Sequence, residues 1–135
     1  MRNAVPTFAL FALAAVRPVW AQASPAPQTP PLQWVFQTRH DAQTNPHTDV
    51  FLRVGSRRVL VLRQAEEEFR IPAKTDYKDA GVPAQALTAC LGWWAGAGDN
   101  LYVVRRGRSL VVYRREVDAQ APDLPWKRFK VISLP

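Results

Sequence analysis

Alternation of apolar and polar residues dominates the chain from Gln33 onward and predicts β-strands. In residues 33–38, Trp34 and Phe36 fall on one face of an extended segment and Val35 on the other. This spacing of two is typical of a strand that packs on one side. Further apolar runs predict strands at residues 49–54, 58–64, 69–71, 101–104, 109–115 and 127–134.

Two pairs of these runs are separated by glycine-containing turns, and each pair predicts a β-hairpin. Gly55-Ser56 suits a two-residue turn, since glycine accepts a positive φ at the first position. In the second pair, Gly107 predicts the left-handed residue of a three-residue loop, because a two-residue turn would force Arg106 to a positive φ. A two-residue loop is the alternative. The first hairpin is apolar on both faces at residues 59–62, so we expect it to lie between a core and a covering layer.

Residues 83–91 are the one helical candidate. Pro83 suits a first helical position, alanine is frequent, and Leu87, Leu91 and Trp94 recur at spacings of four and three. The same residues also alternate in a way that would serve a strand. The stretch that follows, residues 95–100, predicts a flexible loop.

These elements predict an all-β fold with one short helix. The arrangement expected is a small antiparallel barrel or sandwich of about six strands, built as a single domain over residues 33–135. A chain of this length supports one hydrophobic core. Cys90 is the only cysteine, so no internal disulfide is available and the thiol is interpreted as a small buried apolar residue.

The N-terminal residues 1–23 have the pattern of a secretory signal peptide. Arg2 precedes an apolar run over residues 4–16, and Ala21-Gln22-Ala23 supplies small residues at both recognition positions for cleavage. Residues 24–32, rich in proline, predict an extended spacer. We therefore expect a periplasmic or extracellular protein. No later run is long enough to cross a bilayer, so the cleaved protein is not expected to span a membrane.

Cleavage after Ala23 is the first testable prediction. Protein recovered from the periplasm or the medium is expected to begin at Ser24, because the alanine pair fits the recognition positions better than the overlapping Val19-Trp20-Ala21. Intact-mass spectrometry checks this. A mass that retains residues 1–20 would contradict the prediction.

Charge adds a candidate binding surface. The chain carries a formal net charge of +7, and residues 101–135 hold eight basic against three acidic residues. Such a cluster favours an anionic partner, and tryptophans beside a glycine-rich stretch can stack on sugars or anchor an interface. The candidate binding residues are Arg105, Arg106, Arg108, Arg114, Arg115, Trp93 and Trp94.

Candidates for chemistry are few. His40 and His47 lie in a polar stretch without the spacing that holds zinc, and Gly96-x-Gly98 is interpreted as a loop. Residues 66–68 are three glutamates without an evident partner, so they are interpreted as a polar hairpin end. We predict no catalytic, metal or cofactor-binding residue.

The sequence therefore predicts a secreted or periplasmic, non-catalytic binding module. Its expected partner is an anionic envelope component, a glycan or an acidic protein, and nucleic acid is not expected because the protein is exported. The alternative is a small secreted hydrolase or metal-dependent enzyme that uses His40 and His47.

Overall fold

The computed structural model describes residues 28–135, so the predicted signal peptide and the first part of the spacer lie outside the described residues. These residues form eight β-strands and one short 3₁₀ helix, η1. Within them, no helix has the length and apolar character that crossing a bilayer requires. In chain order the elements are β1 (Leu32–His40), β2 (Pro46–Val54), β3 (Arg57–Ala65), β4 (Glu68–Arg70), η1 (Lys74–Asp76), β5 (Thr88–Trp93), β6 (Ala97–Arg106), β7 (Ser109–Asp118) and β8 (Lys127–Ser133).

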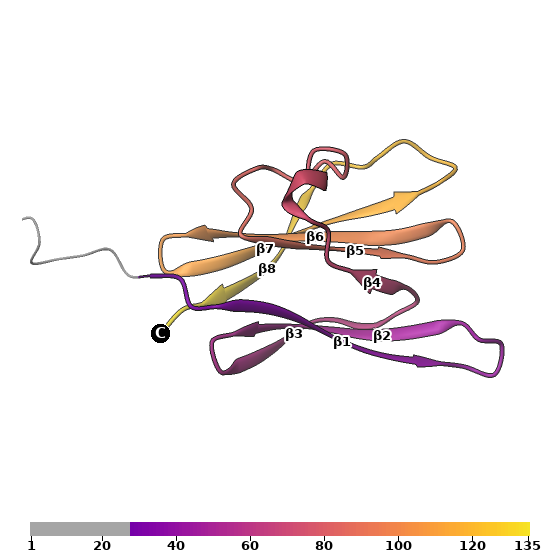
Figure 1. Ribbon diagram of the computed structural model, residues 1–135, viewed down its shortest axis with the longest axis horizontal. Coiled ribbons are helices and arrows are strands. Elements are labelled where there is room, and N and C mark those ends of the chain that lie inside the picture. Colours follow the sequence, from indigo (N-terminus) through magenta and orange to yellow (C-terminus); the bar gives the residue numbers. More distant parts are fainter. Residues whose placement is uncertain (1–27) are drawn as a thin grey trace, which may run out of the picture.

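The strands form two antiparallel sheets. One sheet has the order β1-β2-β3 and the other the order β4-β5-β6-β7-β8, so within each sheet every strand pairs with its neighbours in sequence. Figure 1 shows the sheets as two layers, with the chain passing from one to the other between β3 and β4. The all-β prediction is confirmed as a sandwich, and the two sheets do not close into a barrel.

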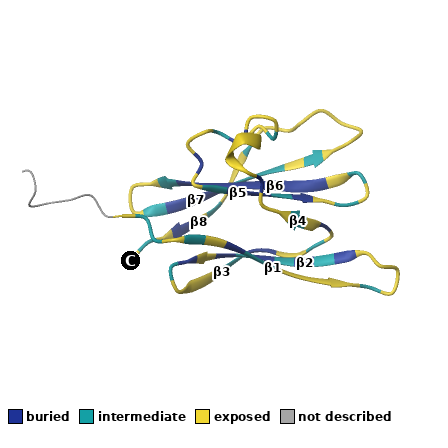
Figure 2. Cartoon of the chain, viewed as in Figure 1, coloured by how far each residue is buried: buried dark blue, intermediate teal, exposed yellow. Residues whose placement is uncertain are grey.

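The main core lies between the two sheets. Alternate residues of β2 are buried, with Val50 and Leu52 fully so, and they meet Leu101 and Val103 from β6. In Figure 2 buried residues, in dark blue, appear in both sheets, most continuously along β6. Trp34 crosses the interface, and its Nε1 donates a hydrogen bond of 3.0 Å to Thr88 Oγ1. Burial of an indole with its N–H satisfied stabilises the contact between the layers.

Within residues 28–135 a covering layer lies over the second hairpin, and none lies over the first. The crossover between β4 and β5 brings Tyr77 and Val82 onto Tyr102 and Val104, on the outer face of the five-stranded sheet. On the outer face of the first hairpin, Phe51 stays half-buried. The expectation for that hairpin was wrong, because its outer apolar side chains are shielded in part by their own neighbours. One such contact places the Arg58 guanidinium 4.3 Å from the centre of the Phe51 ring.

Both predicted hairpins are present. Val54 pairs with Arg57 around the two-residue turn, where Gly55 has a φ of 61°. In the second hairpin Arg106 pairs with Ser109, and Gly107 has a φ of 59°. The three-residue loop is therefore wrong. Because β6 continues through Arg106, glycine occupies the first turn position in both hairpins, as the two-residue geometry requires.

The predicted helix at residues 83–91 is wrong. Leu87 N donates to Val103 O at 2.8 Å, and β5 begins at the next residue. Pairing with β6 places Ala89 and Cys90 on opposite faces, each fully buried, so sheet pairing overrides the helical preference of alanine. The flexible loop predicted at residues 95–100 shrinks to a two-residue turn, because β6 begins at Ala97.

Register shifts interrupt some strand pairs. Between β2 and β3 the pairing shifts twice, next to Val50, and Gln64 takes a φ of 52° there. Asp49 stabilises the irregular segment, since its Oδ1 accepts a 2.7 Å hydrogen bond from Gln64 N. Between β7 and β8 the register shifts once, at Val112 and Tyr113. The β1–β2 pair is regular from Leu32 to His40.

Candidate functional site

The β2–β3 and β6–β7 turns lie at the same end of the sandwich, beside the C-terminus (Figure 1). Two hydrogen bonds join them through the end of β8. Arg57 Nη2 donates to Ser133 O at 2.8 Å, and Leu134 N donates to Arg108 O at 2.9 Å. The turns belong to different sheets, so the sandwich brings basic residues together that lie about 50 positions apart in the sequence.

Five arginines gather there, and we call them the basic end: Arg57, Arg58, Arg105, Arg106 and Arg108. Arg106 and Arg108 are exposed. Arg105 is half-buried, and its guanidinium donates to Gly107 O at 2.8 Å and to Thr29 Oγ1 at 3.0 Å. Arg57 and Arg58 were missed as candidates. The signal that could have found them is the glycine turn that precedes them, because it has the same form as the second one.

The other two candidate arginines lie away from the basic end and on opposite faces of β7. Arg114 Nε donates to Asp99 Oδ1 at 2.7 Å. Arg115 Nη2 donates to Ala80 O at 2.6 Å, and its guanidinium lies 4.6 Å from the centre of the Trp126 ring. The Arg114 guanidinium is therefore held by Asp99, and that of Arg115 by Ala80 and Trp126.

The two tryptophans lie at the opposite end of β6 from the turn arginines. Trp93 is 48% exposed and lines a cleft of about 890 Å³ that Arg115 also lines. Trp94 Nε1 donates to Asn45 Oδ1 at 3.3 Å, which ties the β5–β6 turn to the β1–β2 turn. The structure thus brings Trp93 and Arg115 together and separates both from the basic end.

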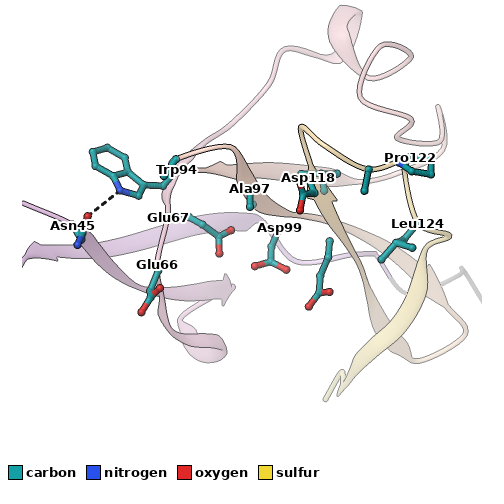
Figure 3. A pocket seen from close by; sticks show the side chains of 14 residues that line it. Asn45, Glu66, Glu67, Trp94, Ala97, Asp99, Asp118, Pro122 and Leu124 are labelled. Atoms are coloured by element: carbon teal, nitrogen blue, oxygen red, sulfur yellow. Dashed lines mark hydrogen bonds between the residues drawn. The ribbon is translucent and has the colours of Figure 1, made fainter.

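A second cleft, of about 590 Å³, opens where the β3–β4, β5–β6 and β7–β8 connections meet. Its wall includes Trp94, Ala97, Pro122 and Leu124, all labelled in Figure 3. We call it the acidic cleft, because five acidic side chains line it: Glu66, Glu67, Asp99, Glu116 and Asp118.

Glu67 is the unusual member of the acidic cleft. It is only 7% exposed, and its Oε1 is buried without a hydrogen-bond partner in the described chain. Burial raises the pKa of Glu67 to about 8, and a hydrogen bond with Asp99 and the charge of Asp99 act in the same direction. The interpretation of residues 66–68 as an unpartnered polar hairpin end was therefore wrong at Glu67. Its partner, Asp99, is 32 residues away and could not be found by spacing.

Residues of β2 and β5 hold Glu67 in place. Thr48 Oγ1 on β2 donates to Glu67 O at 2.6 Å, which fixes the backbone. Gly92 on β5 provides space for the Glu67 side chain, since a Cβ there would lie 2.5 Å from Glu67 Oε1. Gly98 on β6 is equally constrained, because a Cβ there would lie 1.8 Å from the carbonyl oxygen of Gly92. The glycine pair lets the β5–β6 hairpin fold closely beside the buried carboxyl group.

The histidines and the cysteine have separate surroundings. His47 Nε2 lies 3.0 Å from Asp41 Oδ2, and this hydrogen bond lowers the pKa of Asp41. His40 Nε2 lies 3.9 Å from a different carboxylate, that of Glu68. Burial raises the pKa of the Cys90 thiol well above its ordinary value. In residues 28–135 no group of three or more His, Cys, Asp or Glu side chains is arranged to hold a metal ion.

The fold and its two charged regions define a small, two-sheet β-sandwich with a basic end and an acidic cleft. Comparison with protein-family models, curated proteins and solved structures finds no match to this chain.

Proposed function

We propose that this chain is an exported, non-catalytic binding module whose basic end contacts an anionic partner, such as an envelope component, an acidic glycan or an acidic protein. The observation that supports this most directly is the meeting of arginines from two turns and two sheets at one end of the sandwich. The signal-like residues 1–23 support export.

The physical reason is electrostatic. Like charges on one end of a small domain raise the local potential, and an anion relieves this repulsion. Guanidinium groups also donate paired hydrogen bonds to phosphate, sulfate or carboxylate oxygens. Arg106 and Arg108 are exposed at the turn and can reach a ligand without disturbing the core.

The enzyme alternative has less support. It needs His40 and His47 to act together, whereas each imidazole faces a different carboxylate, Glu68 and Asp41 respectively. A general base can be built from one such pair, but the two histidines do not share a partner within the described chain.

The double variant Arg106→Gln/Arg108→Gln tests the binding role. It is expected to weaken binding to heparin or to vesicles containing anionic lipid by about 1–2 kcal/mol, and to flatten the salt dependence. Arg105 is left intact because its guanidinium bonds Gly107 O and Thr29. Measurements are salt-gradient elution from heparin and vesicle sedimentation.

The matched control is Lys74→Gln/Lys78→Gln, which removes the same charge from exposed positions on the crossover. It is expected to shift elution much less. Equal elution of the two double variants would show that only net charge matters, and would contradict a specific role for the basic end.

A further inference from the structure

The acidic cleft carries more negative charge than its surroundings balance. Among the described residues that line it, none is lysine or arginine. Arg114 is a cation whose charge acts on Glu67, and its guanidinium is engaged with Asp99 at 2.7 Å and with Glu116 at 3.5 Å. No ion pair within residues 28–135 reaches Glu66, Glu67 or Asp118.

An independent observation points to a missing partner. Glu67 is more than nine-tenths buried, lines the cleft, and has an Oε1 atom without a hydrogen-bond partner in the described chain. Figure 3 shows the Glu67 and Asp99 carboxyl groups next to each other inside the cleft, with Leu124 and Pro122 on the opposite wall. A buried carboxyl group with an unsatisfied acceptor is costly, and a donor that enters the cleft and bonds this carboxyl group would lower that cost.

The shape and lining of the cleft indicate the kind of cation. A volume of about 590 Å³ falls in the range of small-molecule sites and is far larger than a single ion needs. Ala97, Pro122 and Leu124 add apolar surface beside the carboxylates. An organic cation matches both features, because its alkyl chain packs on the apolar wall while its N–H groups donate to carboxylate oxygens.

We propose that the acidic cleft binds a primary ammonium or guanidinium group, which donates hydrogen bonds to Glu67 and Asp99. The group can come from a free polyamine or from the lysine or arginine side chain of a peptide. This site is distinct from the basic end and does not depend on it.

Binding has a protonation signature. Glu67 is protonated near pH 7 in the free protein, because burial and Asp99 raise its pKa to about 8. A bound cation favours the charged carboxylate, so binding at pH 7 releases a proton. Other titratable or charged groups also face this region: Asp99, Glu116, Arg114 and the buried Cys90 thiol. Asp99 raises the pKa of Glu67, and the positive charge of Arg114 lowers it.

Isothermal titration calorimetry with two probes tests the proposal. Spermidine and an acetylated, amidated tetralysine peptide are titrated into the protein at pH 7, in two buffers that differ in ionisation enthalpy. Wild-type protein is expected to bind at least one probe with proton release. Glu67→Gln is expected to bind about tenfold more weakly and to release no proton. Binding of spermidine alone identifies a free amine, and tighter binding of the peptide identifies a side chain.

The matched control is Glu68→Gln, since Glu68 is the adjacent residue and does not line the acidic cleft. It is expected to bind like wild type. If Glu67→Gln fails to fold, Asp118→Asn, an exposed change in the cleft wall, replaces it and is expected to weaken binding severalfold. Absence of binding by wild type, equal loss in Glu68→Gln, or tighter binding of Ca²⁺ than of both organic probes would overturn the proposal.

Discussion

Alanine in place of Gly98 is expected to destabilise the fold by about 3 kcal/mol or more. The added Cβ would lie 1.8 Å from the carbonyl oxygen of Gly92 and 2.6 Å from its carbonyl carbon. Both atoms belong to the backbone of β5, so no side-chain rotation can relieve the clash. Relief requires that the β5–β6 hairpin move apart, next to the buried Glu67. Urea denaturation followed by tryptophan fluorescence measures the loss.

Gly107→Ala is the matched control for this change. Its φ is 59°, so alanine is strained there, but a Cβ would have open space around it. The expected cost is about 1 kcal/mol, which reflects the backbone conformation alone. A Gly98→Ala variant that unfolds at the same urea concentration as Gly107→Ala would contradict the close approach of the two strands.

Wild-type protein is expected to lose about 3 kcal/mol of stability between pH 5 and pH 8.5 that Glu67→Gln does not lose. The cause is the pKa of Glu67, raised from 4.5 to about 8 in the folded state by burial and by Asp99. Between these two values the folded protein holds a proton that the unfolded chain releases, so rising pH favours unfolding. The stabilisation is complete below about pH 4.5 and is lost as the pH rises through 8.

Denaturant titrations of both proteins at the two pH values give this difference directly. Glutamine resembles the protonated carboxyl group and does not titrate, whereas Asp99, Arg114 and Cys90 are unchanged in the variant. Glu66→Gln is the control, because Glu66 is exposed whereas the adjacent Glu67 is buried. Parallel pH profiles for wild type and Glu67→Gln would show that the Glu67 carboxyl group is solvated.

Strand alternation and the glycine turns were enough to predict the all-β fold and both long hairpins. The signals were strong because β2 alternates buried and less buried residues along its length, and Gly55 occupies a turn position that few other residues accept. The same logic failed for β5. Its Thr-Ala-Cys-Leu sequence lacks β-branched residues after Thr88, and pairing with β4 and β6 makes it a strand.

The turn after β5 was hidden for a related reason. Ala95 and Gly96 both have positive φ values, 52° and 90°, which is the geometry of a two-residue hairpin turn with both central residues left-handed. Alanine is unfavourable in that position, so the sequence does not resemble the usual asparagine-glycine signal. Alanine at this position is held by the strands on either side.

The sites divide in the same way. The arginines at the β6–β7 turn, Arg105, Arg106 and Arg108, could be found by counting charges, because they are close in sequence. The acidic cleft could not, since Glu67, Asp99 and Glu116 come from three separate segments, and only the β6–β7 register places Asp99 opposite Glu116. The nearest sequence signal is indirect: Gly92 is small where the buried carboxyl group needs space, and Gly98 is small where its strand closely approaches Gly92.

The strand register has a further consequence for how this protein behaves at high concentration. Each outermost strand of an open sheet presents free amide and carbonyl groups that can recruit a strand from another molecule. Three of the four outermost strands are poor templates, because β4 has only three residues and both β3 and β8 are paired with interruptions. Only β1 is long and evenly paired within the described chain. Self-association through strand addition is therefore expected at β1. A proline at a β1 position whose N–H points away from β2 would block it.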